Sequence, residues 1–77
     1  MLFKKNEEKT LLKQEIRNKR IEIRELRKLH RKWVASFMKE TDPTIAVMQM
    51  AVIHMQAVRI AEAENLLILM RKHYKLI

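Results

Sequence analysis

Apolar residues in the first half of the chain recur at alternating spacings of four and three. This spacing keeps them on one face of a helix and is typical of a coiled-coil seam. The seam positions are Leu12, Ile16, Lys19, Ile23, Leu26, His30, Trp33 and Phe37. Lys19 and His30 are the two polar interruptions. The pattern predicts one long helix over residues 7–40.

The second half has a different pattern, because apolar residues surround most of the predicted helix. From Ile45 to Ala61 a short polar line is formed by Gln49, Gln56 and Arg59. A helix that is apolar nearly all round is usually buried nearly all round. We therefore predict a second helix over residues 43–75 that needs more cover than one neighbouring helix supplies.

The only turn signal is Thr41-Asp42-Pro43-Thr44. Proline disfavours helical backbone angles at the residue before it, and it is well tolerated as the first residue of a helix. Asp42 is a suitable N-cap for the second helix. Near the start of the chain, Asn6 followed by two glutamates is a similar signal.

A turn as short as residues 41–43 makes the two helices antiparallel neighbours. The fold class predicted is all-α, with residues 1–77 forming a single helical-hairpin domain. The expected register sets Phe37 near Val47, Trp33 near Ala51, Leu26 near Val58 and Ile16 near Ile68, and His30 level with His54. Glu8, Glu15 and Glu22 also repeat every seven residues, as do Lys13, Arg20 and Arg27. That repeat favours a parallel coiled coil instead, and we rank it below the hairpin.

A lone hairpin would leave much of the second helix exposed, which soluble monomers avoid. We therefore expect the chain to associate through the second helix with itself or with a partner, most simply as a two-fold dimer that forms a four-helix bundle. The residues expected at this interface all lie on the second helix. They are Ile45, Met48, Val52, Met55, Leu66 and Leu69.

Composition narrows the possible chemistry. The 77 residues include 17 Lys and Arg against 9 Asp and Glu, a net charge of +8, with no Gly and no Cys. The absence of glycine argues against a glycine-cradled phosphate loop, and the absence of cysteine excludes disulfides and thiolate metal clusters. Residues 1–40 carry +7 of the charge and residues 41–77 carry +1. We therefore expect a negatively charged partner to bind the first helix.

The basic residues of the first helix form a stripe. Lys13, Arg17, Arg20, Arg24, Arg27 and Arg31 follow one another at spacings of four and three, and Lys28 and Lys32 thicken the line. Like charges four residues apart destabilise an isolated helix, so an external anion would explain the stripe. Arginine also matches phosphate and carboxylate geometry better than lysine does. We predict that these eight residues bind nucleic acid, and an acidic protein surface is the alternative anion.

No constellation for catalysis is present. His30, His54 and His73 lack the spacing of metal ligands within a helix, and Ser36 has no evident base beside it. We therefore expect no enzyme activity, no metal and no cofactor. His30 and His54 could in principle hold zinc across the hairpin, but a polar layer is the favoured interpretation.

The function predicted is that of a non-enzymatic nucleic-acid-binding accessory protein in the cytoplasm. The alternative is a protein-interaction adaptor or inhibitor that docks its helices on a larger protein. A third hypothesis is a helix that lies on an anionic membrane surface. The N-terminal residues lack the apolar core of a secretory signal, and the apolar stretch Ile45–Met70 is interrupted by polar residues. We therefore expect no integral membrane association.

Overall fold

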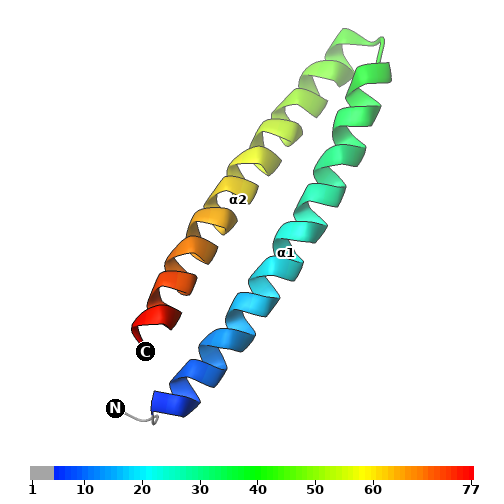
Figure 1. Ribbon diagram of the computed structural model, residues 1–77. Coiled ribbons are helices and arrows are strands. Elements are labelled where there is room, and N and C mark those ends of the chain that lie inside the picture. Colours follow the sequence, from blue (N-terminus) through cyan, green and yellow to red (C-terminus); the bar gives the residue numbers. More distant parts are fainter. Residues whose placement is uncertain (1–4) are drawn as a thin grey trace.

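The computed structural model describes residues 5–77, which form two helices, α1 (Lys5–Lys39) and α2 (Pro43–Leu76). The helices run antiparallel and side by side along a molecule 57 Å long (Figure 1). The all-α hairpin is thus confirmed. Because Glu8 lies close to His73 and Lys9 close to Tyr74, α2 covers the α1 seam along its whole described length. The prediction about a secretory signal rests partly on residues 1–4, outside the described residues.

The turn is built as the sequence predicts. The Asp42 carboxylate accepts hydrogen bonds from the backbone N–H groups of Thr44 (2.9 Å) and Ile45 (3.5 Å), with Pro43 in the first turn of α2. The Glu40 carboxylate accepts hydrogen bonds from the N–H groups of Thr41 and Asp42. Asp42 thus satisfies donors that the start of α2 leaves free, and Glu40 satisfies donors of the turn itself. Asn6, in contrast, lies within the described part of α1, where its side-chain oxygen accepts a hydrogen bond from the N–H group of Glu7 (3.0 Å).

The predicted α1 seam is the face that packs against α2. Its eight residues are all buried or half-buried, and the neighbouring positions are mostly exposed. Ile23, near the middle of α1, is only 6% exposed. Lys19, one of the two polar seam residues, turns its ammonium group to Glu22 at 2.6 Å. The heptad spacing therefore predicts the inner face of α1 correctly.

On α2 two glutamines face inward and many apolar residues face outward. Gln49 and Gln56 are each only 9% exposed, whereas Val47, Met48 and Met55 are 65–68% exposed. The inward positions of α2 also alternate at spacings of three and four. They are Ala46, Gln49, Ile53, Gln56, Ile60, Ala63, Leu67, Met70 and Tyr74.

The predicted register is therefore wrong in its facing residues. Val47, Ala51, Val58 and Ile68 were expected to face α1, and all four are exposed. His30 meets Gln56 instead of His54, with its Nδ1 3.2 Å from the glutamine Oε1. Successive residues are about 100° apart around a helix, so an error of two residues moves a side chain to another face.

Two polar contacts join the helices in the half of the hairpin near the turn. One is the contact between His30 and Gln56, and in the other Gln49 Nε2 donates to Ser36 Oγ at 3.2 Å. Buried polar groups of this kind can fix the register of paired helices at a cost in stability. Of the side chains described in residues 5–77, Gln49 alone has a buried polar atom, Oε1, without a hydrogen-bond partner.

Replacing Gln49 with Leu should stabilise the protein by about 1–2 kcal/mol, because the substitution removes a desolvated carbonyl that has no partner. Ser36 is exposed and can bond to water instead. Urea unfolding followed by circular dichroism, at a fixed protomer concentration, measures the change. If Gln49→Leu instead destabilises the protein by about 1–2 kcal/mol, the Gln49 carbonyl has a hydrogen-bond partner outside the single hairpin.

The outward apolar surface makes α2 unusual. By length and composition alone, α2 could cross a membrane, and only 6% of its most apolar window is buried within the hairpin. The buried core helix of a soluble protein can have the same length and apolar composition as a membrane-spanning helix. The cytoplasmic location therefore stays a prediction.

Candidate nucleic-acid interface

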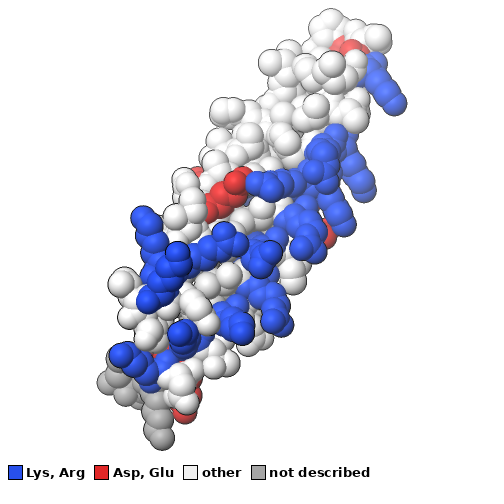
Figure 2. All heavy atoms as spheres, in the orientation of Figure 1, with Lys and Arg blue, Asp and Glu red and all other residues white. Residues whose placement is uncertain are grey.

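The basic stripe lies on the surface of α1. All eight predicted residues, from Lys13 to Lys32, are exposed. Two of them have acidic partners: Arg27 pairs with Glu64 at 3.0 Å and Lys28 with Glu25 at 3.6 Å. Within residues 5–77, the other six make no ion pair. Figure 2 shows basic side chains crowded along this face of the molecule, with the turn end almost free of them.

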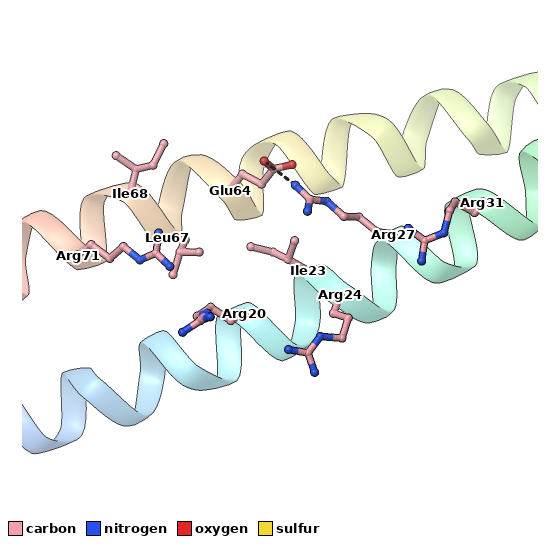
Figure 3. Close-up of a pocket in the computed structure, with 9 residues that line it drawn as sticks. All are labelled: Arg20, Ile23, Arg24, Arg27, Arg31, Glu64, Leu67, Ile68 and Arg71. Carbon is pink, nitrogen blue, oxygen red and sulfur yellow. Dashed lines mark ion pairs between the residues drawn. The ribbon is translucent and has the colours of Figure 1, made fainter.

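Four of the stripe arginines line a groove between the two helices. The groove has a volume of about 460 Å³, and Ile23 and Leu67 contribute to its apolar lining (Figure 3). α2 adds Arg71 to it, so arginines approach from both helices. The arginines that line it are Arg20, Arg24, Arg27, Arg31 and Arg71.

A second hollow continues the groove toward the chain ends. Its volume is about 300 Å³, and it shares Arg20 and Arg71 with the first. Ile16 and Tyr74 form part of its lining. We call the two hollows together the basic groove. Its cationic residues are Lys13, Arg17, Arg20, Arg24, Arg27, Arg31 and Arg71.

Charge pairing differs along the basic groove. Arg27 on α1 meets the carboxylate of Glu64 on α2. About two turns toward the chain ends, Arg20 on α1 and Arg71 on α2 line the same hollows without a carboxylate between them. Like charges on both sides of a hollow repel each other and attract an anion. This end of the groove is therefore the part best suited to a phosphate group.

The structure brings six of the eight predicted residues to the basic groove and adds Arg71 from α2. Lys28 and Lys32 do not line the basic groove, and Lys32 borders a separate hollow with Leu29 and Trp33. The charge pattern does not single out Arg71, because residues 41–77 carry only +1 of the net charge. The signal that could have found it is its position: in an antiparallel hairpin Arg71 lies near the level of the stripe's first residues.

The predicted oligomer interface lies on a different surface. Ile45, Met48, Met55, Leu66 and Leu69 are each between 44% and 68% exposed, and Val52 is half-buried. No residue of this set lines the basic groove. A partner could therefore cover the apolar surface and leave the arginines free.

Metal binding has no candidate cluster of ligands among the described residues. Across residues 5–77 no group of three or more His, Asp or Glu side chains could hold a metal ion. His54 is exposed and His30 contacts Gln56, so the two histidines do not form a zinc site across the hairpin.

No protein-family model matches the chain, and no curated protein or solved structure matches it either. The fold and the basic groove are therefore the basis for a functional proposal.

Proposed function

We propose that the protein is a non-enzymatic nucleic-acid-binding accessory protein that holds phosphate groups along the basic groove. The observation that carries this proposal is the continuous line of seven cations, of which Arg27 alone is paired with a carboxylate. From Lys13 to Arg31 the line extends about 27 Å, at 1.5 Å per residue. That length is comparable to about eight base-pair steps of a duplex.

Phosphate contacts explain the choice of residues. Guanidinium groups donate paired hydrogen bonds to phosphate oxygens, and such contacts position a protein on nucleic acid without reading its sequence. Aromatic residues make up only 5% of the chain, too few for a series of stacked bases. We therefore expect the protein to have only a weak preference for nucleotide sequence. The proposed location is the cytoplasm, where nucleic acid is accessible.

The proposal includes a homodimer formed through the exposed apolar surface of α2, which produces a four-helix bundle. Exposed apolar residues this numerous are costly in water, and a second copy supplies matching cover. A membrane-spanning hairpin is disfavoured because α1 would carry its arginines and glutamates into the bilayer beside α2. The acidic surface of another protein is an additional partner that the charge of the stripe fits.

Fluorescence anisotropy titrations with labelled duplex DNA, single-stranded DNA and RNA at 50 mM salt test the proposal. We expect micromolar or tighter binding to at least one of the three. Absence of binding to all three would refute the proposal. Helix content from circular dichroism in the same buffer shows that the protein used is folded.

A second candidate function is that of an adaptor or inhibitor that docks on a larger protein. The observation that favours it is the exposed methionine cluster on α2, where Met48, Met50 and Met55 are 55–68% exposed. Methionine side chains adapt to varied apolar surfaces. Such a protein would bind one partner at fixed stoichiometry and would ignore nucleic acid in the same titrations.

A further inference from the structure

The exposed surface of α2 carries a second heptad seam. Its residues follow one another at alternating spacings of three and four, as the inner seam does, but on the flank away from the basic groove. Its apolar members are the six predicted interface residues. In order, this second seam is Ile45, Met48, Val52, Met55, Arg59, Glu62, Leu66 and Leu69.

Two charged residues stand in the middle of the second seam. Arg59 and Glu62 are both exposed, and neither makes an ion pair with any other described residue. They line a hollow of about 200 Å³ beside Leu66 and the Lys19–Glu22 pair. This hollow shares no lining residue with either part of the basic groove. Charges at the centre of an apolar seam need partners when the seam is covered.

We propose that a second copy of the chain covers this seam with its α2 antiparallel, so that Arg59 of each subunit pairs with Glu62 of the other. This inference rests on the dimer of the proposed function and specifies its orientation and register. The two-fold axis passes between Ile60 and Ala61, near the middle of α2 (Pro43–Leu76). The same register places Met55 against the partner subunit's Leu66 and Val52 against the partner subunit's Leu69. Both ion pairs thus lie between apolar layers.

Other arrangements of the same seam leave the charges without partners. A parallel pair in register would set Arg59 against Arg59 and Glu62 against Glu62, which is repulsive. An antiparallel pair shifted by one heptad would set Arg59 against Met55 or Leu69 of the partner subunit. It would also shorten the overlap of the two helices. The register with the longest overlap is therefore also the one that pairs both charges.

Charge reversal tests the register, with mass measured by light scattering during size-exclusion chromatography. The wild-type chain should have twice its 9.3 kDa mass. Arg59→Glu alone or Glu62→Arg alone should weaken the dimer at least tenfold, because each sets like charges together twice. Mixing the two variants should restore a one-to-one heterodimer, and the double variant should restore the homodimer. Restoration separates the proposed pairing from any damage to the hairpin.

Four results would contradict the inference. If both single variants dimerise as tightly as the wild type, or if mixing fails to restore dimerisation, the register is wrong although the dimer stands. If the wild type is a monomer, or binds anionic vesicles in place of itself, the proposed dimer is wrong as well. Cysteine crosslinking reports the orientation independently, because the chain has no cysteine. Met55→Cys mixed with Leu66→Cys should crosslink, whereas Met55→Cys alone should not.

Discussion

Replacing Arg17, Arg20 and Arg24 with Glu should lower the affinity for nucleic acid by at least about 100-fold at 50 mM salt. The three arginines are exposed, have no acidic partner and line the basic groove. Their reversal removes three phosphate contacts and adds three repulsive charges, and a 100-fold loss corresponds to about 2.8 kcal/mol. Helix content should persist, because Glu at position 20 can pair with Arg71 across the groove.

A control variant must separate the effect of net charge from the effect of the position of the substituted residues in the groove. Replacing Lys39, Lys72 and Lys75 with Glu changes the net charge by the same amount at three positions outside the basic groove. We expect this control to lower the affinity only a few-fold at the same salt concentration. Equal losses in the two triple variants would mean that net charge, and not the groove, determines binding.

Replacing Arg71 with Glu should lower the affinity roughly tenfold and leave the hairpin at least as stable. The change removes the cation that α2 adds to the basic groove, and tenfold corresponds to about 1.4 kcal/mol. In the folded protein the new carboxylate would lie near Arg20, much as Glu64 lies near Arg27. The affinity comes from anisotropy titrations and the stability from urea unfolding.

Lys72 offers a matched control because it is the next residue on α2, is exposed and does not line the groove. Lys72→Glu makes the same charge change, yet it should weaken binding by less than threefold. If Arg71→Glu and Lys72→Glu behave alike while the wild type binds, α2 contributes nothing specific and the site consists of the stripe on α1 alone.

The features set by local chemistry could be predicted from the sequence. The heptad spacing identifies the inner face of α1, because its charged residues leave only one apolar face to bury. The turn follows from Asp42 and Pro43, whose effects on the backbone are local. The exposure of the stripe follows from the cost of burying six unpaired cations.

The inner face of α2 could not be predicted in the same way. Apolar residues surround that helix, so hydrophobicity does not distinguish the side that meets α1. The structure places Gln49 and Gln56 inward, where they bond to Ser36 and His30 of α1. With α2 in this orientation, Met48 and Met55 are exposed and Arg71 lines the basic groove. The face of α2 that packs against α1 is determined by contacts between the two helices. The periodicity of one helix contains no information about these contacts.

The salt dependence of binding reports how many phosphate groups the basic groove contacts. Anisotropy titrations of the wild-type protein with the tightest-binding oligonucleotide, between 50 and 200 mM salt, give the slope of log K against log salt concentration. Six groove cations lack a carboxylate partner, so the account predicts a slope as steep as about −5 for a duplex and about −4 for a single strand. An affinity that does not change with salt would contradict phosphate binding in the basic groove.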